Sequence, residues 1–294
     1  MRGFFIGRLL GWLGEDWGVG GVVPGSVARL LRDVGRFRVR FLVAGFSGWP
    51  DAGNVSTLTV GYLKDKLEAE KIWEMGGEEF YTLTSTRPYV RISGGVIRDL
   101  KPPTTELYRW LSPMGDKALL ILIGGEPSIN WGLYVERILG VCSEAGITKI
   151  YMVGGVLDSV PHTRRPRISA VVNMEHLREE VRLFGLRPSE YNGPSSIHSY
   201  LMMKAKERGI EAVGIWGHAP SYVNMPNTMV ALHVLRKLTG ILGVEVDMDE
   251  MEENARELEM EVERMVSENP ELQRLVKVLE KSYEEEEGSP SYIS

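Results

Sequence analysis

Short apolar runs that alternate with longer amphipathic segments are the feature that most constrains the fold of this chain. Five of these runs lie between residues 39 and 219, and segments with helical spacing separate most of them. A strand that is apolar on both faces belongs in the middle of a sheet with helices on its two sides. The sequence therefore predicts an α/β fold in residues 37–245, namely a three-layer αβα sandwich with a mostly parallel, mixed sheet.

The predicted strands are VRFLVAGF (39–46), ALLILIGG (118–125), KIYMVGGVL (149–157), RISAVVN (167–173) and EAVGIWGHA (211–219). A helix is predicted at residues 54–67, and a second one carries Trp131, Val135, Ile138, Leu139 and Cys142 on one side. The segment YVRISGGVIRDL (89–100) predicts a hairpin that turns at Gly94 and Gly95.

Charge and cysteine usage exclude several classes of partner. A formal net charge of -6 and a pI of about 5.6 leave no basic surface for nucleic acid or for an anionic membrane. The single cysteine, Cys142, cannot form an internal disulfide, which favours a reducing compartment and hence a cytoplasmic location. No apolar run approaches the roughly 20 residues that a membrane helix needs.

The N-terminal extension, residues 1–36, differs in composition from the rest of the chain. Its beginning resembles a signal peptide, but Arg8 interrupts the apolar part and no clean cleavage site follows, so export is the minority interpretation. One alternative is an amphipathic segment that packs on the body or on a neighbouring subunit, with Phe5, Leu9, Trp12 and Leu13 on its apolar side. The other is an extension without fixed structure.

The loops after the predicted strands are the candidate ligand crevice, because ligands bind beyond the carboxyl ends of parallel strands. The loops are rich in glycine and proline, and we expect them to converge on one edge of the sheet. The candidate crevice residues, with one serine ahead of a helix, are Trp49, Asp51, Glu126, His162, Arg164, Ser195, His218 and Tyr222.

Asp51, Glu126 and Ser195 also have structural interpretations. We expect Asp51 to cap the helix that begins near Gly53, with Trp49 as an apolar plug in the loop cluster and any ligand role secondary. Glu126 before a proline terminates its strand. Ser195 or its neighbour caps the next helix, whose start is otherwise a place for an anion.

Each of the remaining candidates also has two possible roles. His162 with Arg164 forms either an anion site or a solvated or intersubunit surface. His218 with Tyr222 forms either a proton-transfer pair or a buried polar pair that satisfies loop backbone. The chain has no Gly-x-Ser-x-Gly elbow and no glycine-rich phosphate or dinucleotide loop, so we expect neither a cofactor nor a metal.

Several separate motifs together resemble the proteasome assembly chaperone 2 family, especially its prokaryotic members. In chain order they are GFSGWPDAGN, GGEPSINW, VPHTRRP, YNGPSSI and APSYVNMPN. The resemblance runs from about Val39 into the C-terminal helices. It implies an αβα fold similar to that of purine nucleoside phosphorylases, symmetric homo-oligomers of three or more copies, and proteasome subunits as partners. It supplies no accepted set of catalytic residues.

The C-terminal region is predicted to be a helical pair, residues 246–283, followed by an acidic disordered tail, residues 284–294. The first helix has an apolar seam with charge elsewhere, and its interface candidates are Met251, Leu258, Val262 and Met265. This seam either forms a subunit interface or lies across the sheet domain of its own chain. In the tail, Tyr292 is displaced by one position from the terminal motif of proteasome-binding relatives.

Two functional classes stay open at this point. The first is a homo-oligomeric interaction protein that resembles an assembly chaperone and has no catalysis. The second is a small-molecule hydrolase or transferase that acts on an anionic substrate at the strand-end crevice. The missing nucleophile, metal and nucleotide signatures weigh against the second class.

Overall fold

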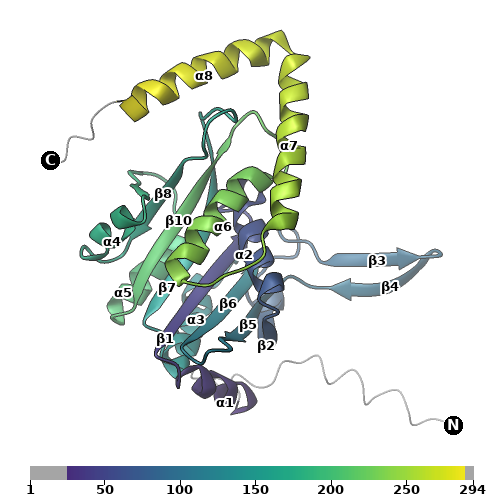
Figure 1. Cartoon of the computed structure of the whole chain (residues 1–294). Helices are drawn as coiled ribbons and strands as arrows, with labels where there is room; N and C mark the ends of the chain where they lie inside the picture. The colour runs from purple at the N-terminus through teal and green to yellow at the C-terminus, as the bar shows by residue number, and fades with distance from the viewer. Residues whose placement is uncertain (1–24, 289–294) are drawn as a thin grey trace.

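The computed structural model of the protein describes residues 25–288 (Figure 1). Its strands are β1 (Val39–Ser47), β2 (Glu70–Gly76), β3 (Tyr89–Ser93), β4 (Val96–Lys101), β5 (Thr104–Leu111), β6 (Lys117–Gly125), β7 (Lys149–Asp158), β8 (Ile168–Val172), β9 (Arg187–Pro188) and β10 (Glu211–Pro220). Its α-helices are α1 (Gly25–Val34), α2 (Val55–Lys66), α3 (Trp131–Ala145), α4 (Leu177–Leu183), α5 (Ile197–Glu207), α6 (Thr228–Leu242), α7 (Asp249–Ser267) and α8 (Pro270–Gly288).

Eight of the strands form one mixed sheet, in the order β2-β5-β6-β1-β7-β10-β8-β9. The four central strands β6, β1, β7 and β10 are parallel, so that Val43 of β1 is paired with Ile121 on one side and with Tyr151 on the other. Strands β5 and β8 are antiparallel to their central neighbours. The predicted α/β fold with a mostly parallel, mixed sheet is therefore confirmed.

Helices cover both faces of this sheet and complete three layers (Figure 1). Side chains of β1 alternate between the two sides because successive residues of a strand point in opposite directions. Leu42 and Phe46 join α1, α3 and α5 in one apolar core, whereas Val43 joins α2 and α6 in the other. All three side chains are fully buried, as strands covered on two sides require.

Helix α1 lies in the part of the chain that was assigned to the N-terminal extension. Its residues Val27, Leu31 and Val34 are buried in the core beside α3. The packed domain therefore begins by residue 25, and the boundary at residue 36 was drawn too late. The expectations for Phe5, Leu9, Trp12 and Leu13 concern positions outside the described residues.

Helix α7 lies across its own chain, which was one of the two alternatives for the seam. Met251 is buried against the α2 and α6 side of the domain, and Leu258 and Val262 are buried in a small cluster with Val223. Met265 packs on the same cluster. These interface candidates are therefore covered by the chain itself and do not form an open subunit surface.

The structure corrects one further expectation, and it shows where the predicted hairpin lies. Helix α8 continues to Gly288, so the start of the expected disordered tail is helical, and Tyr292 lies outside the described residues. The hairpin β3–β4 forms as predicted, but as a separate two-stranded sheet that projects from the body (Figure 1). No helix within residues 25–288 combines the length and apolar character that crossing a bilayer requires.

Candidate functional site

The carboxyl ends of the central parallel strands lie at one edge of the sheet, and their loops meet there. Asp51 and Gly155 form an isolated parallel bridge, and the backbone N–H of Gly155 donates to the carbonyl of Pro50 at 2.8 Å. The loop after β1 therefore lies against the carboxyl-terminal part of β7. The backbone N–H of Asn227, in the loop after β10, donates to the carbonyl of Gly53 at 2.7 Å, so the loops after β1 and β10 converge as expected. The turn after β8 does not join them, because β8 runs antiparallel to β10.

Asp51 binds the first turn of α2 with both carboxylate oxygens. Its Oδ1 accepts the backbone N–H groups of Ser56 at 2.8 Å and of Thr57 at 3.1 Å, and its Oδ2 accepts the Thr57 hydroxyl at 2.7 Å. The side chain is buried, and burial raises the pKa of this carboxyl above its ordinary value. The capping interpretation of Asp51 is confirmed, although α2 begins at Val55 and not near Gly53.

Asp51→Ala should destabilise the protein by about 1–3 kcal/mol, since it leaves two helix N–H groups without their acceptor in a buried place. Asp51→Asn should retain most of the stability, because the amide oxygen can still accept these N–H groups. Thermal melts of the three proteins measure the difference. Equal melting temperatures would contradict the capping role.

Glu126 accepts a backbone N–H group at the start of α5, as Asp51 does for α2. Its Oε1 accepts the backbone N–H of Ile197 at 2.8 Å, and the carboxylate also accepts the N–H of Trp49. Burial raises the pKa of this carboxyl. Ser195 was expected to cap this helix or its neighbour to do so, but the Ser195 hydroxyl donates to the carbonyl of Ser196 at 2.9 Å, and the side chain of Ser196 makes no capping bond.

Trp49 does not have the predicted role of an apolar plug. Its side chain is 58% exposed, even though its backbone N–H is held by Glu126. The loop cluster is closed by backbone and carboxylate hydrogen bonds, and the indole ring stands outside it. Trp49 is therefore a surface residue of this edge.

Tyr222 pairs with His162 and not with His218. The phenol oxygen accepts the backbone N–H of His162 at 2.7 Å and lies 2.6 Å from Nδ1 of the same residue. One hydroxyl thus contacts both the backbone N–H and the ring of His162. Burial lowers the pKa of His162, whose imidazole is partly covered by Tyr222 and α7. The Tyr222 hydroxyl thus satisfies loop backbone, but it does so with His162, whereas that role was considered for a pair of Tyr222 with His218.

His218 instead forms a relay with two residues that the sequence did not single out. Its Nε2 lies 2.8 Å from the Ser169 hydroxyl, and its Nδ1 lies 2.8 Å from Oδ2 of Asp158. The bond to His218 lowers the pKa of Asp158, and Arg167 adds to this effect. These groups come together because β8 and β7 flank β10 on its two sides.

A hydroxyl, an imidazole and a carboxylate in this order can move a proton as hydrolases do. The burial of the Ser169 hydroxyl argues against its use as a hydrolase nucleophile. Ser169 is only 5% exposed, and its oxygen already contacts the Ser189 hydroxyl at 2.8 Å. The relay is therefore best explained as a chain of hydrogen bonds that ties β7, β8 and β10 together. Within the described part of the chain no group of His, Cys, Asp and Glu side chains is placed to hold a metal ion.

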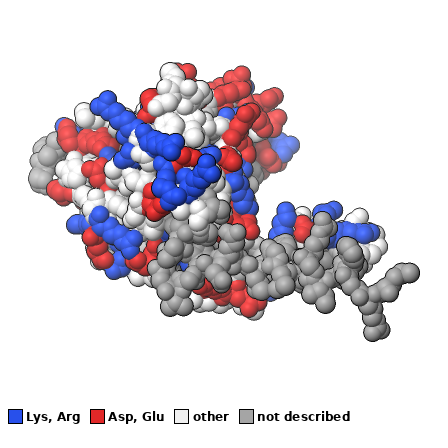
Figure 2. All heavy atoms as spheres, turned by 90° about the horizontal axis from the view of Figure 1, so that it is seen from below, with Lys and Arg blue, Asp and Glu red and all other residues white. Residues whose placement is uncertain are grey.

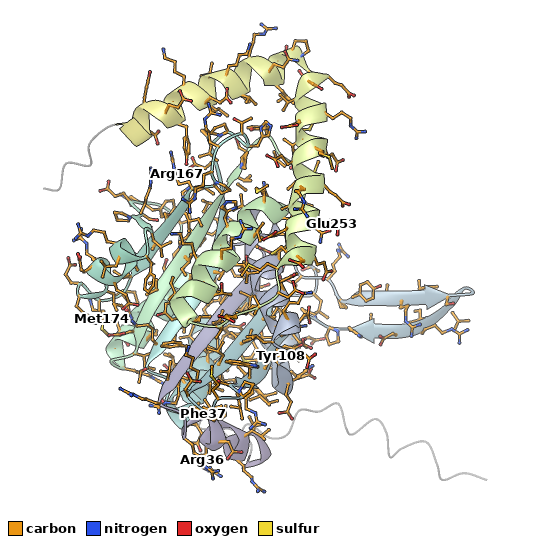
Figure 3. All side chains as sticks on the ribbon, in the orientation of Figure 1. Arg36, Phe37, Tyr108, Arg167, Met174 and Glu253 are labelled. Atoms are coloured by element: carbon orange, nitrogen blue, oxygen red, sulfur yellow. The ribbon has the colours of Figure 1, made fainter. Side chains whose placement is uncertain are left out.

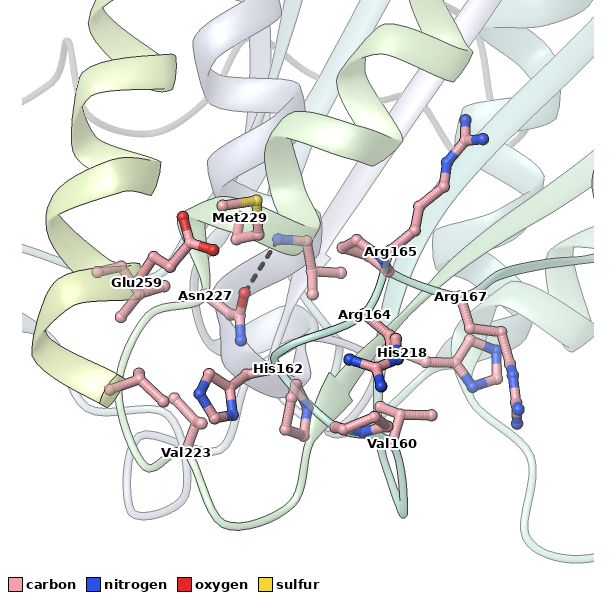
Figure 4. A pocket seen from close by; sticks show the side chains of 16 residues that line it. Val160, His162, Arg164, Arg165, Arg167, His218, Val223, Asn227, Met229 and Glu259 are labelled. Atoms are coloured by element: carbon pink, nitrogen blue, oxygen red, sulfur yellow. Dashed lines mark hydrogen bonds between the residues drawn. The ribbon is translucent and has the colours of Figure 1, made fainter. Parts of the chain in front are cut away.

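The cavity at this edge lies between the loop after β7 and helix α7 (Figure 4). His162, Arg164 and His218 line it together with Leu258 and Val262, whereas Asp51 and Glu126 do not. Its volume of about 30 Å³ leaves room for water molecules, each of which needs about 10–15 Å³. A second, more open cavity of about 330 Å³ lies between the loop after β7 and helices α7 and α8, and His162 is the one predicted crevice residue that lines it. The predicted crevice residues therefore do not line one common pocket among the described residues.

Arg164 binds helix α8 of its own chain. Its guanidinium lies 3.1 Å from Glu280 and 2.6 Å from Glu284. Arg167, which lies beneath α8 in Figure 3, pairs with Glu286. The Tyr283 hydroxyl adds a bond of 2.8 Å to the carbonyl of Arg165. The basic loop that was a candidate anion site thus binds carboxylates of the C-terminal helix.

Comparison with known proteins shows which family has this sequence and this fold. A family model described as the PAC2 family matches residues 45–266, which include the whole strand-end edge. The chain belongs to the PAC2 family. The proteasome assembly chaperone 2 resemblance of the sequence motifs is thereby confirmed.

Solved structures of PAC2-like proteins have the same architecture. A proteasome-assembly chaperone homologue from Mycobacterium tuberculosis is 29% identical, with a TM-score of 0.73 over 80% of this chain and 99% of that one. A PAC2 family protein from Streptomyces avermitilis is 28% identical, with a TM-score of 0.72 over 81% and 99%. PbaB, an archaeal proteasome activator from Pyrococcus furiosus, is 24% identical, with a TM-score of 0.62 over 79% and 94%, and shares the fold.

Proposed function

We propose that this PAC2 protein is a cytoplasmic, homo-oligomeric protein that resembles an assembly chaperone and binds proteasome subunits through its surface. The observation that carries the proposal is the likeness to a proteasome-assembly chaperone homologue over 99% of that protein's length. The geometry of the strand-end edge supports it. Asp51, Glu126 and Tyr222 use their polar atoms to hold the loops in place, and none of the three lines a cavity at this edge.

A protein with this function acts through rigid contact surfaces, and two parts of the molecule fit that description. The loops at the strand-end edge are held by backbone and carboxylate bonds, as the pairing of Asp51 with Gly155 illustrates. The C-terminal helices add a long surface that carries many carboxylates. The alternative of a hydrolase draws support from the Ser169 relay, and the burial of that hydroxyl weakens it.

Native gels and light scattering of the protein mixed with α-type proteasome subunits of the same organism test the proposal. We expect a stable complex and faster formation of the α-ring. A variant that lacks residues 289–294 separates the two modes of binding, because it should bind normally if the folded surface is used and should fail if the displaced Tyr292 motif docks. Absence of any complex with the unaltered protein would refute the proposed function.

A further inference from the structure

The loop of residues 160–167, which follows β7, is here called the basic loop. It carries Arg164, Arg165 and Arg167 and contains no acidic residue. Arg167 reaches back to Asp158 at the end of β7, at 3.4 Å. At the opposite end of the molecule, which Figure 2 shows, Lys and Arg side chains instead lie among Asp and Glu side chains. Positive charge that is concentrated in this way favours an acidic segment as its partner.

Helix α8, which crosses above this edge of the sheet in Figure 1, binds the basic loop with one side. The Thr163 hydroxyl donates to Glu280 at 2.5 Å, and Glu280 and Glu284 both pair with Arg164. The buried and the bonded side chains of α8 recur at i, i+3, i+4, i+7 and i+8, which is the spacing of one helical face. The two apolar members are 5% and 8% exposed. This face, here called the docking face, consists of Val276, Leu279, Glu280, Tyr283 and Glu284.

Tyr283 and Glu286 extend this contact to the other arginines. The Tyr283 hydroxyl donates to the carbonyl of Arg165 at 2.8 Å. The Arg167 guanidinium lies over the Tyr283 ring, 5.2 Å from its centroid, and also pairs with Glu286. The helix therefore binds the basic loop through charge, through an aromatic ring and through a backbone acceptor.

The part of α8 that meets the arginines is strongly acidic. Residues 280–287 contain five glutamates and one lysine. That lysine, Lys281, is 80% exposed and lies 3.8 Å from Glu285 of the same helix. Lys277 lies nearer to α7 and lines the open cavity between the two helices. Carboxylates therefore predominate where α8 covers the basic loop.

Helix α8 is held weakly enough to be displaced. Its ion pairs with the basic loop use side chains such as Glu284, which is 62% exposed, and pairs of exposed charges contribute little to stability. Four consecutive glutamates, residues 284–287, lie near the carboxyl end of the helix, where negative charge is unfavourable. The open cavity of about 330 Å³ lies between α7 and α8, so the two helices lose packing contacts there. The position of α8 therefore depends on the basic loop.

We infer that the basic loop is the docking site for an acidic, amphipathic helix of a protein partner, and that α8 covers this site until the partner displaces it. The docking face shows what the partner helix must carry, namely two apolar residues, two glutamates and a tyrosine at the spacing given above. The apolar positions favour a helix over nucleic acid, because a phosphate backbone offers no apolar face. The inference rests on the partner binding in the proposed function and names the surface that performs it.

A second copy of this chain is the less favoured occupant. Its α8 would make the same contacts, but the covalent link gives the chain's own helix an effective concentration on the order of millimolar. A separate copy at micromolar concentration cannot displace it, whereas a partner with further contacts on the surface can. Light scattering checks this argument. An oligomer that Arg164→Glu alone dissociates would make a second copy the occupant and overturn the inference.

Hydrogen exchange of the full-length protein tests whether the basic loop holds α8. Arg164→Glu puts like charges opposite Glu280 and Glu284, so the amides of residues 276–286 should exchange about tenfold faster. Arg256→Glu is the matched control, because it makes the same charge change at an exposed arginine of α7. If Arg164→Glu leaves exchange in α8 unchanged, or if both substitutions speed it equally, the loop does not hold α8 and the inference is overturned.

A peptide of residues 270–288 is the probe for the uncovered site. Glu280→Gln with Glu284→Gln removes two carboxylates from the chain's own α8 without adding positive charge. This full-length variant should therefore bind the peptide about tenfold tighter than the unaltered protein does. A peptide with the same residues in scrambled order is the control. If the scrambled peptide binds equally well, or if neither peptide binds, the site does not dock a helix and the inference is wrong.

Binding of α-type proteasome subunits tests the partner. Glu280→Gln with Glu284→Gln should bind them about tenfold tighter, since α8 competes less, and Arg164→Glu should bind them about tenfold more weakly. Glu253→Gln with Glu257→Gln, at two exposed positions of α7, should bind like the unaltered protein. If all four proteins bind the subunits equally, the proposed function stands and the docking site is wrong. If none binds them but the peptide binds, the docking site stands and the proposed function is wrong.

Discussion

His198→Leu is expected to stabilise the protein against unfolding, and the gain should grow as the pH falls below about 6.5. His198 lies in the first turn of α5 and is 1% exposed. Its ring packs between Phe46 and Trp216, with ring centroids 5.4 Å and 4.9 Å away. Neither ring nitrogen has a hydrogen-bond partner among the described residues. A leucine of similar volume removes these two unsatisfied atoms from the core.

The pH dependence follows from the pKa of His198, which burial lowers from 6.5 to about 3. Between these two values the unfolded chain binds a proton that the folded chain does not bind, so the stability of the unaltered protein decreases as the pH falls. The decrease due to this residue is about 1.4 kcal/mol per pH unit within that window. Above pH 6.5 both states are neutral at this position, and the slope disappears.

Urea unfolding of the unaltered and the His198→Leu proteins at pH 7, 6 and 5 measures this effect. The difference between their free energies of unfolding should widen by about 1–2 kcal/mol from pH 7 to pH 5. His176→Gln is the control, since His176 is exposed and pairs with Glu211 on the surface, where a pair contributes little. Parallel stabilities of the unaltered and leucine proteins at all three pH values would show that His198 is hydrated or paired.

Gly155→Ala is the second change with a large expected effect. An ideal Cβ at this position would lie 2.2 Å from the backbone oxygen of Ala52 and 3.0 Å from Cβ of Val55. The oxygen cannot retreat without breaking the bridge between the loop and β7, in which Gly155 donates to Pro50. We expect a loss of about 3 kcal/mol or more, at the upper end of the range for overpacking in a core.

Urea unfolding again measures the loss, and α2 offers a matched glycine. Gly61 lies inside that helix with no atom within 4 Å of an ideal Cβ. Gly61→Ala should therefore stabilise the protein by about 0.5–1 kcal/mol, because alanine is the better helix former. If Gly155→Ala leaves the stability unchanged or raises it as Gly61→Ala should, the close approach at Gly155 is not tight.

The central strands could be predicted from the sequence because strands buried on both faces leave continuous apolar runs. Strands β2 and β5 were missed, since only part of each is buried and their apolar runs are short. The direction of β8 was also missed, because a strand has the same pattern in either direction. The contact between Ser169 and His218 depends on the antiparallel pairing of β8 with β10, so it could not be predicted either.

The role of a candidate residue could be predicted where its side chain binds groups that are close to it in the sequence. Asp51 binds N–H groups five and six residues later, and its place ahead of a helix indicated that role. His162 and Tyr222 are 60 residues apart in the sequence. The sequences of the loops did not indicate whether Tyr222 would contact His162 or His218. The seam of α7 was similarly visible as an apolar face, while the surface that covers it was not.

Glu126 and the start of α5 are linked across 71 residues of sequence, which constrains how homologous chains can diverge. A lineage that loses the carboxylate at position 126 must provide another acceptor for the N–H of Ile197. The nearest substitute is the side chain of Ser196, which occupies the N-cap position with an extended backbone and makes no capping bond here. Substitutions at positions 126 and 196 should therefore be correlated among homologues, even though the two side chains serve the same helix from separate loops.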